Sequence, residues 1–476
     1  MGNEDCLFLN VLAPANAKNL PVLFWIHGGG YGQGSASTFD FSYLDKTANN
    51  GFVSVVIQYR LGAFGFLSSA DVAKHGIPNA ALHDMRFALQ WVKKYISRFG
   101  GDPDQVTIAG ESAGGGSVML MAMANGGEDG TTLFRRAIAS SPYLPTQPNY
   151  DDELPTDYYL QFAQRAGCLG NDDNSLDSAA VFKCLQNADS ILLQKASANT
   201  SYSAKYGQWA FIPVTDGELI KELPTQQLTA GKVNGERIVT GNNANEGTYF
   251  VPQNITTESL FSDFVRFNYP QVSPENLTAV LGLYNISGSP VGPKHDTDGL
   301  HPPYATQVSN YAVGWQQAAN NLYAETTFVC PAYWLADAYS KDTTKKAWRY
   351  QFSIPDATHG KDIAPLTLDP ATSDAMDPTF RKGFQSIWGQ FIVSGDPTLS
   401  TSAIFSAGGD DVLLAAAGRD AWLPWGSAGK FDMLNLNVTA TKPTKAEWKV
   451  VDGKVWEGGR GARCDLWAKL GAVVQE

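Results

Sequence analysis

The sequence predicts an α/β protein, in which a mostly parallel, twisted sheet carries helices on both faces. Three observations lead to this fold class. Short apolar runs rich in β-branched residues alternate with segments of helical periodicity in the first half of the chain. One run passes straight into a helix through the glycine-bracketed stretch 110–114. Hydrophobic residues make up 43% of the chain and charged residues 17%, which is typical of a globular protein with a large core.

Six apolar runs are predicted to be strands, and in chain order they are 22–26, 53–59, 106–108, 136–139, 237–240 and 348–352. The clearest helix is predicted over residues 79–101, between the second and third runs, and two glycines end it. Its apolar residues recur on one helical face at Leu82, Met85, Leu89, Val92 and Ile96.

Two further stretches, 151–230 and 250–313, look irregular and polar. We expect them to be insertions that cap one side of the sheet, not linkers between independent domains. Large α/β enzymes often fold as one decorated unit at this length, so residues 1–476 are predicted to form a single domain.

The charge and hydropathy of the chain argue against some partners. A formal net charge of −12 disfavours nucleic acid, because phosphate binding needs clustered lysine and arginine. No apolar run approaches the roughly 18 residues that a membrane span requires. No basic and apolar leader precedes Met1, so we expect no signal peptide in this chain. No cysteine pair has the C-x-x-C spacing typical of zinc or redox sites.

Ser112 lies where a nucleophile elbow would place its serine, at the tip of a tight strand-to-helix turn. Such a turn needs small residues two before and two after the serine, and Gly110 and Gly114 occupy those positions. The short pattern can arise by chance in a chain with 46 glycines, so its weight comes from the flanking strand and helix. We predict that Ser112 is a catalytic nucleophile.

A serine hydroxyl needs a base, which is usually a histidine oriented by a carboxylate. The chain has six histidines, and the elbow order of serine, acid and histidine leaves only His295, His301 and His359. The first two lie in a proline- and glycine-rich stretch with no strand to fix them, whereas His359 follows a strand-like run. Ligands bind beyond the carboxyl ends of parallel strands, so His359 is the predicted base.

The orienting acid should follow a strand that lies between the serine and the histidine. Run 237–240 is such a strand, and Glu246 lies in its exit loop. The chain has 47 acidic residues, and position alone leaves other carboxylates open as the acid.

Run 22–26 ends in His27 and is followed by Gly28-Gly29-Gly30, where bare backbone can approach a substrate oxygen. A flexible glycine turn and a phosphate-binding loop are the alternatives. The second fails because the G-x-x-x-x-G-K pattern is absent. We predict that N–H groups of this turn, together with that of Ala113, form an oxyanion hole.

These residues together resemble the type-B carboxylesterase/lipase family, which includes cholinesterases and fungal lipases. EDCLFLNV (4–11) and GDPDQVTIAGESAGGGSV (101–118) resemble its two signatures, and YRLGAFGFL and ALHDMRFALQWV match the segments between them. ANEGTYF resembles the family's acid motif and THGKDI its histidine motif. The resemblance covers essentially all 476 residues. It implies an α/β-hydrolase fold with Ser112 as nucleophile, Glu246 as acid and His359 as base.

The resemblance implies further roles. Gly29, Gly30 and Ala113 would be the oxyanion donors, and Arg60 and Asp84 would form a structural ion pair. The implied disulfides are Cys168–Cys184 and Cys330–Cys464. Cys6 matches a family cysteine whose partner lies upstream, so we expect a chain that is N-terminally truncated relative to the family. The stretch ASSPYLPTQP resembles a fungal subgroup.

The implied function is a serine hydrolase that cleaves carboxylic esters through an acyl-enzyme, with broad and fairly apolar specificity. A lipase acting on longer acyl chains is the alternative. A non-catalytic cholinesterase-like adhesion protein is less favoured, because members of that class lose the serine or the histidine. No metal or organic cofactor is implied, since the nucleophile is the protein's own hydroxyl; the expected partner is a small ester.

Secretion is the expected localisation, from the family, the cysteines and the sequons. Five Asn-x-Ser/Thr sequons occur, at Asn199, Asn254, Asn276, Asn285 and Asn437.

Overall fold

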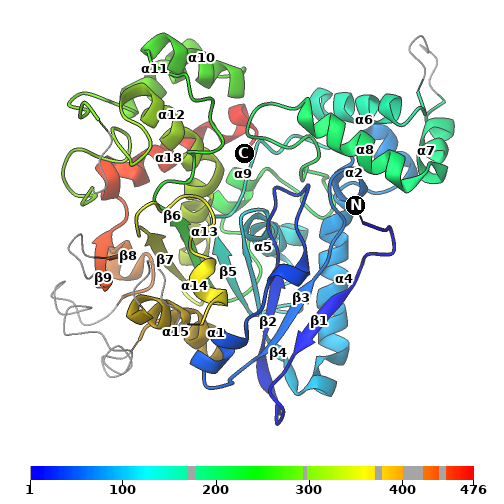
Figure 1. The fold of residues 1–476 in the computed structure, drawn as a ribbon, viewed down its shortest axis with the longest axis horizontal. Coiled ribbons are helices and arrows are strands. Elements are labelled where there is room, and N and C mark those ends of the chain that lie inside the picture. The colour runs from blue at the N-terminus through cyan, green and yellow to red at the C-terminus, as the bar shows by residue number, and fades with distance from the viewer. Residues whose placement is uncertain (1, 170–176, 293–296, 370–377, 400–421, 439–445) are drawn as a thin grey trace.

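The computed structural model describes residues 2–169, 177–292, 297–369, 378–399, 422–438 and 446–476. Within these residues nine strands form one sheet, in the order β1-β3-β2-β4-β5-β6-β7-β8-β9 (Figure 1). Neighbouring strands are parallel except at the two edges, where β1 pairs with β3 and β8 pairs with β9 in antiparallel fashion. The strands are β1 Leu9–Leu12, β2 Leu20–Ile26, β3 Val53–Ile57, β4 Gly101–Glu111, β5 Arg136–Ser140, β6 Arg237–Asn243, β7 Lys346–Phe352, β8 Asp432–Val438 and β9 Ala446–Asp452.

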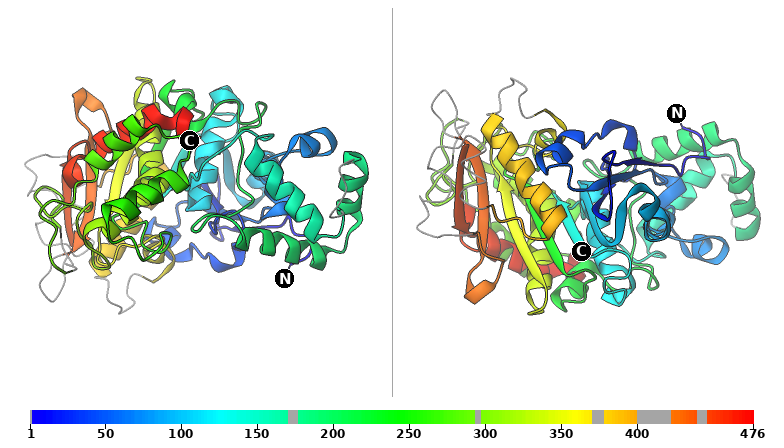
Figure 2. Two further views of the ribbon diagram at one scale, coloured as in Figure 1. Left: turned by 90° about the horizontal axis from the view of Figure 1, so that it is seen from above. Right: turned by 90° about the horizontal axis from the view of Figure 1, so that it is seen from below.

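Helices cover both faces of this sheet, so the predicted α/β class is confirmed (Figure 2). The described helices are α1 Ser42–Thr47, α2 Ala63–Phe66, α3 Ala70–His75, α4 Ala80–Tyr95, α5 Ala113–Met123, α6 Glu153–Arg165, α7 Ser178–Asn187, α8 Ser190–Tyr202, α9 Pro224–Thr229, α10 Glu258–Asn268, α11 Pro274–Leu283, α12 Gly314–Ala324, α13 Cys330–Ser340, α14 Ala364–Thr367, α15 Pro378–Ser394 and α18 Trp456–Val474. The turn η4 (Glu325–Val329), which is π-helical, joins α12 to α13.

Alternate residues of β2 enter two different hydrophobic cores, as the period of two along a strand requires. Val22, Phe24 and Ile26 belong to the core that includes α4, α5 and α13. Leu23 and Trp25 belong to the core on the other face, which α1 and α15 cover. The near-continuous apolar run therefore reflects a strand buried on both faces, as is typical of parallel sheets.

The six predicted strands correspond to β2–β7, and the predicted helix corresponds to α4 with a following turn of 3-10 helix. That turn ends at Gly100, whose φ of 82° lies in the left-handed region. The structure adds the antiparallel edge strand β1, which pairs with β3, and the two strands β8 and β9 at the opposite edge, for which we had no prediction.

The stretches 151–230 and 250–313, which we expected to be irregular, contain the helices α6–α9 and α10–α11. The prediction was wrong because helix-starting residues look like loop residues in a sequence. Asp177 and Asp189 cap the first N–H groups of α7 and α8, and Pro274 occupies the first turn of α11. Both groups of helices lie in the upper part of Figure 1.

An ion pair joins the exit of β3 to helix α4. Arg60 donates from Nε to Asp84 Oδ2 at 2.8 Å and from Nη2 to Asp84 Oδ1 at 2.7 Å, a two-pronged contact that fixes orientation as well as distance. This is the structural pair that the resemblance implied.

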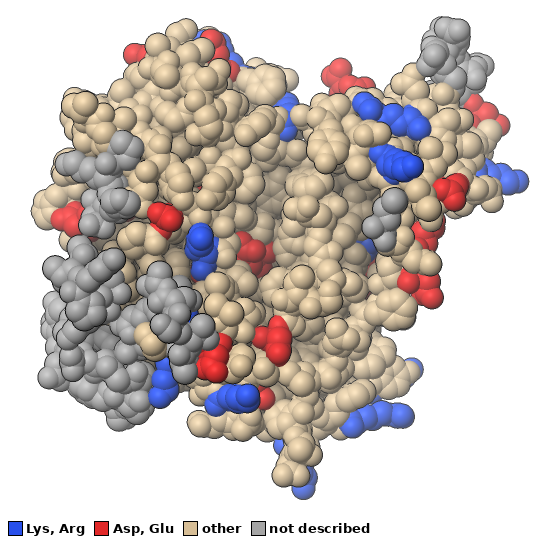
Figure 3. Space-filling view, viewed as in Figure 1, with Lys and Arg blue, Asp and Glu red and all other residues tan. Residues whose placement is uncertain are grey.

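The molecular surface in Figure 3 carries acidic and basic side chains in small, mixed groups, and no large area of that face has a single sign. None of the helices in the described ranges is both long enough and apolar enough to span a bilayer.

Two disulfides tie distant parts of the chain together. Cys168 bonds Cys184 across a separation of 16 residues, and Cys330 at the start of α13 bonds Cys464 in α18 across 134 residues. Cys6 is a free thiol that is partly buried.

The two disulfides should differ in their contribution to stability. A cross-link that closes a longer loop removes more entropy from the unfolded chain, so Cys330→Ala/Cys464→Ala should lower the free energy of unfolding by about 5 kcal/mol and Cys168→Ala/Cys184→Ala by about 3 kcal/mol. Urea unfolding under oxidising conditions measures both. Cys6→Ala is the control and should change stability by less than about 0.5 kcal/mol. A larger loss for the short-range pair would contradict the expectation.

Candidate active site

Ser112 stands in a strained turn between β4 and α5. Its φ of 58° and ψ of −126° lie outside the helical and extended regions, a conformation that costs free energy unless the surroundings impose it. The surroundings do so with backbone hydrogen bonds: Ser112 N–H donates to Ser140 O at 3.1 Å, and Gly116 N–H donates to Ser112 O at 2.8 Å. The side chain of Ser112 therefore projects from the carboxyl edge of the sheet.

The glycines on either side of Ser112 are required by the close approach of three backbones. A Cβ on Gly114 would lie 2.1 Å from the carbonyl oxygen of Ile26, and one on Gly110 would lie 2.4 Å from the carbonyl carbon of Gly114. Neither contact is possible without moving β2 or the turn. Packing therefore requires glycine at both positions, as the sequence analysis predicted for a tight strand-to-helix turn.

His359 lies in the loop after β7, with its imidazole between a hydroxyl and a carboxylate. The ring nitrogen Nε2 is 2.8 Å from Ser112 Oγ, and Nδ1 is 2.5 Å from Glu246 Oε2. The other downstream histidines do not compete. His301 is exposed and pairs with Asp298, and His295 lies outside the described residues.

Glu246 is fully buried in the loop after β6 and is held by donors that our sequence analysis did not identify. Its Oε1 accepts a hydrogen bond from the Asn243 backbone N–H at 2.6 Å and another from Ser141 Oγ at 2.5 Å. These bonds leave Oε2 directed at the imidazole. Ser141 follows predicted strand 136–139, so the rule that chemistry gathers after parallel strands could have found it.

A second buried carboxylate supports the first without touching the imidazole. Asp362 accepts hydrogen bonds from Asn243 Nδ2 at 3.1 Å, from Tyr350 OH at 2.8 Å and from Ser140 Oγ. Burial raises the pKa of Asp362. Asn243 thus lies between the two carboxylates and donates to both, with its side-chain nitrogen 3.3 Å from Glu246 Oε1.

A third carboxylate, that of Glu111, lies 3.4 Å from His359 Nε2. Burial raises the pKa of Glu111 to about 8, although the nearby imidazole opposes the shift. Burial also lowers the pKa of His359, but the negative charges of Glu111 and Glu246 outweigh this and raise it to about 9. Glu111 therefore stabilises a positive charge on the imidazole.

The glycine turn after β2 lies against the nucleophile. A Cβ on Gly28 would be 3.0 Å from Ser112 Cβ, and the positive φ angles of Gly29 (118°) and Gly30 (63°) turn the backbone away from β2. Among the described residues, none accepts a hydrogen bond from the backbone N–H of Gly29, Gly30 or Ala113. Three N–H groups, two on the glycine turn that touches Ser112 at Gly28 and one on the residue after Ser112, are thus free to donate to a negatively charged oxygen.

His27 has a structural role in this turn. It is fully buried, its ring stacks on Tyr59 at a centroid distance of 4.4 Å, and its Nδ1 is 2.8 Å from Gly28 O. Burial lowers the pKa of His27, so the ring is neutral near pH 7.

A cavity of about 1220 Å³ opens beside the glycine turn. Gly32, Gln33 and Trp209 contribute to its wall, and the Trp209 ring lies so close to the turn that a Cβ on Gly30 would be 1.8 Å from the indole nitrogen. In the described part of the chain, no group of three or more His, Cys, Asp or Glu side chains could hold a metal ion.

Taken together, a hydroxyl, an imidazole and a carboxylate form a continuous hydrogen-bonded series beside unpaired N–H groups. Such an arrangement can remove the hydroxyl proton while the oxygen attacks an electrophilic carbon, and can stabilise the oxyanion that forms.

Comparisons with known proteins show which family and fold the chain shares. Residues 1–448 match the carboxylesterase family. A secreted lipase of Arthroderma benhamiae is 28% identical over 98% of this chain and 83% of its own length, and lipase 2 of Geotrichum candidum is 36% identical over 59% of this chain and 52% of its own. The crystal structure of Aspergillus niger EstA superposes with a TM-score of 0.77 at 26% identity, over all of this chain and 85% of that one.

The glycine at position 114 should be irreplaceable. Gly114→Ala puts a methyl group 2.1 Å from the Ile26 carbonyl oxygen, so we expect a loss of about 3 kcal/mol or more in the free energy of unfolding. Gly282→Ala in α11 is the matched control, because its Cβ would meet open space. Removing a helical glycine there should stabilise the protein by up to about 1 kcal/mol. Chemical denaturation compares the two, and equal effects would argue against the close approach.

The charge of Glu111 should be measurable at the imidazole. Above its own pKa of about 8, Glu111 carries a negative charge 3.4 Å from Nε2, and Glu111→Gln removes that charge, so the pKa of His359 should fall below its value of about 9. Nuclear magnetic resonance of isotopically labelled histidine follows the titration. Glu258→Gln, on the exposed side of α10, is the control and should leave it unchanged. An unaltered titration in Glu111→Gln would show that another group raises the pKa.

Proposed function

The chain belongs to the carboxylesterase family and is a carboxylic ester hydrolase, and we propose that Ser112, His359 and Glu246 carry out the hydrolysis through an acyl-enzyme. The observation that carries the proposal is the pair of contacts at one imidazole: 2.8 Å from Nε2 to Ser112 Oγ and 2.5 Å from Nδ1 to Glu246. A hydroxyl is a weak nucleophile until a base accepts its proton, and this geometry supplies that base.

In the first half of the reaction, Ser112 Oγ attacks the ester carbonyl carbon while His359 Nε2 takes the hydroxyl proton. Only the neutral imidazole can do this, so the rate should depend on the pKa of His359. Glu246 keeps Nδ1 protonated and stabilises the imidazolium that forms. The imidazolium then donates its proton to the leaving alcohol oxygen, and the acyl group stays on Ser112.

In the second half, a water molecule gives its proton to His359 and attacks the acyl carbon. The proton returns to Ser112 Oγ as the acid product leaves. Both tetrahedral intermediates carry a negative oxygen, and we assign the N–H groups of Gly29, Gly30 and Ala113 as the donors that stabilise it. The unpaired state of these N–H groups in the described structure supports that assignment.

The surroundings of the turn support a substrate class. The wall of the cavity beside it holds apolar side chains such as Leu7, Phe64 and Trp209, which fit the hydrocarbon part of an ester, although neither Ser112 nor His359 belongs to that wall. We propose a carboxylesterase with broad, fairly apolar specificity. A lipase is the second candidate, because two of the similar fungal proteins are themselves described as lipases.

We also propose that the protein is secreted. The relative from Arthroderma benhamiae is described as secreted, and disulfides such as Cys168–Cys184 persist mainly in oxidising compartments. Sequon residues Asn254 and Asn285 are exposed and could carry glycans. The disulfides and the sequons agree with the same compartment.

Ser112→Ala tests the proposed function. The variant should lose about 10⁴-fold or more in kcat on p-nitrophenyl butyrate, because no nucleophile remains, while its unfolding midpoint stays close to that of the wild type. Ser386→Ala in α15 is the control and should keep full activity. Turnover that survives in Ser112→Ala would refute the assignment.

The same assay with longer acyl chains separates the two candidates. A carboxylesterase should turn over the butyrate ester faster than the palmitate ester, and dispersing the substrate as droplets should not help. Faster cleavage of long chains at a droplet surface would make the protein a lipase.

A further inference from the structure

One long helix passes beside the active site and changes its geometry there. Helix α12 runs through η4 into α13 without a break, and only the five residues of η4 are π-helical. A π turn closes its hydrogen bonds five residues back instead of four, which makes it rare and often a mark of functional sites. Because a π turn is rare, contacts with the rest of the protein must stabilise residues 325–329 in this wider form.

The first residue of the π turn, Glu325, is fully buried in a network of charged side chains. Arg463 donates two hydrogen bonds to its carboxylate, at 2.8 and 2.7 Å, and Arg460 donates a third at 3.0 Å. Tyr284 OH adds a fourth at 2.8 Å. Burial raises the pKa of Glu325, but the two guanidinium groups outweigh it and hold the pKa below its usual range, so the carboxylate stays ionised.

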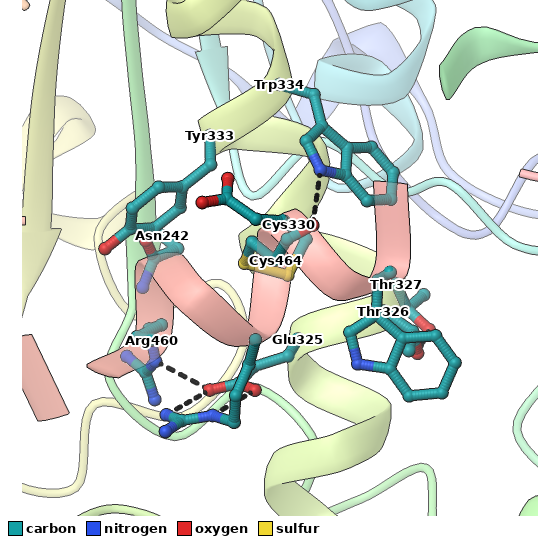
Figure 4. Close-up of a disulfide and its surroundings, with 12 residues drawn as sticks. Asn242, Glu325, Thr326, Thr327, Cys330, Tyr333, Trp334, Arg460 and Cys464 are labelled. Atoms are coloured by element: carbon teal, nitrogen blue, oxygen red, sulfur yellow. Dashed lines mark hydrogen bonds and ion pairs between the residues drawn. A yellow bond between two sulfur atoms is a disulfide. The ribbon is translucent and has the colours of Figure 1, made fainter. Parts of the chain in front are cut away.

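Both arginines come from α18, which a disulfide joins to the same helix one residue beyond the π turn. Figure 4 shows Glu325 and Arg460 linked by dashed lines, with the Cys330–Cys464 disulfide beside them. The π turn is therefore fixed at one end by buried ion pairs and at the other by a covalent bond.

The fourth residue of the turn, Phe328, points away from this network and packs on the proposed base. Its ring centroid is 4.3 Å from that of His359, with the two planes inclined by 38°. Phe328 is 1% exposed, and Tyr143 and Phe250 pack on it at centroid distances of 5.5 and 5.6 Å. The aromatic ring thus has little freedom to move.

The wider turn explains why Glu325 lies in the ion-pair network while Phe328 lies against His359. On an α-helix, residues three apart lie on nearly the same face. In a π turn each residue advances less around the axis, so Phe328 falls further from the face of Glu325. The loop that carries Tyr143 is tied to the same turn, because Leu144 N–H donates to Thr327 O at 2.8 Å.

The hydrogen bonds of the imidazole leave one motion unconstrained. Both lie in the plane of the ring, and they resist sliding in that plane better than tilting out of it. Phe328 covers a face of the imidazole, whereas Phe250 meets it edge-on at an interplanar angle of 80°. Tilting would lengthen the 2.8 Å contact between Nε2 and Ser112 Oγ.

We infer that Phe328 is a positioning residue, which holds the imidazole of His359 in line with Ser112, and that the π turn anchored by Glu325 sets the place of Phe328. This inference rests on the proposed function, since it assumes that His359 is the base.

A fluorophosphonate probe separates base placement from folding. The probe phosphonylates an activated serine with loss of fluoride, so the final extent of labelling reports the folded fraction and the rate reports the base. Phe328→Ala should be labelled to the wild-type extent at Ser112 but about 10²-fold more slowly, as expected for a displacement of about 1 Å. Its kcat on p-nitrophenyl butyrate should fall in parallel, with little change in KM.

A matched control removes an equally buried ring elsewhere. Phe391 in α15 is 0% exposed and belongs to the core on the other face of the sheet. Phe391→Ala should lose stability but keep the labelling rate of its folded fraction. Equal slowing in the two variants would overturn the inference, because it would show a general effect of core loss. If Phe328→Ala does not fold, the labelling rate of Phe328→Leu is measured in its place. A wild-type labelling rate in Phe328→Leu would also overturn the inference.

The pH dependence gives a second readout. Burial lowers the pKa of His359, and removing the covering ring admits water and relieves that effect. The pH at which labelling reaches half its maximal rate should therefore rise in Phe328→Ala and stay constant in Phe391→Ala. The polar and charged groups that act on the imidazole are Glu111, Glu246, Asp362 and Ser112, and none of them is substituted. No shift would contradict the inference.

The link from the ion pairs to Phe328 is tested by a double-mutant cycle. Arg463→Lys keeps the positive charge but cannot form the bidentate pair of hydrogen bonds that Arg463 donates to Glu325. It should slow labelling severalfold when Phe328 is present and add nothing in Phe328→Ala. Additive losses would show that the ion pairs act by another route and would overturn the second half of the inference. Labelling of wild type at a residue other than Ser112 would instead overturn the proposed function itself.

Discussion

The active site depends on one steric constraint, the meeting of three backbones at the end of strand β2. Helix α5 leaves the tip of β4 so close to Ile26 that Gly110 and Gly114 have no room for a side chain. This crossing forces Ser112 to project from the sheet edge and brings the glycine turn of Gly28 against it. Hydroxyl and N–H groups are then in place together, before any other residue is considered.

Around that turn, the protein concentrates negative charge in an unusual way. The carboxyl groups of Glu111 and Glu246 lie 3.4 and 2.5 Å from the imidazole of His359, and Asn243 donates hydrogen bonds to both Glu246 and Asp362. Glu246 and Asp362 are tolerated because Asn243 and three hydroxyl groups, those of Ser140, Ser141 and Tyr350, donate hydrogen bonds to their oxygens. Glu111 Oε1 has no hydrogen-bond partner among the described residues, and burial raises the pKa of Glu111 to about 8. The negative charges of Glu111 and Glu246 stabilise the protonated imidazole of His359.

Local patterns account for what could be predicted along the chain. Strands β2–β7 are apolar runs because both faces of a parallel strand are buried, and α4 repeats its apolar residues every three to four positions. Strand β8 escaped prediction because Asp432 and Asn435 lie within it and are themselves buried. Asn435 is accommodated by a hydrogen bond from Ser353 on the loop after β7, a partner 82 residues away that no local pattern reveals.

The sequence by itself determined the proposed chemistry, because residue types in a strict local order carry it: a serine between required glycines, a histidine and a glutamate after strands, and a glycine turn. Only the tertiary structure decided the distances between these groups and which other residues hold Glu246 and His359 in place. Ser141 acts on Glu246 and Phe328 on His359 across stretches of chain that propensity and periodicity cannot span, whereas Asn243 is only three residues from Glu246. No local sequence pattern marks the π turn of residues 325–329. It is stable because buried partners such as Arg460 and Arg463 hold Glu325 at its start.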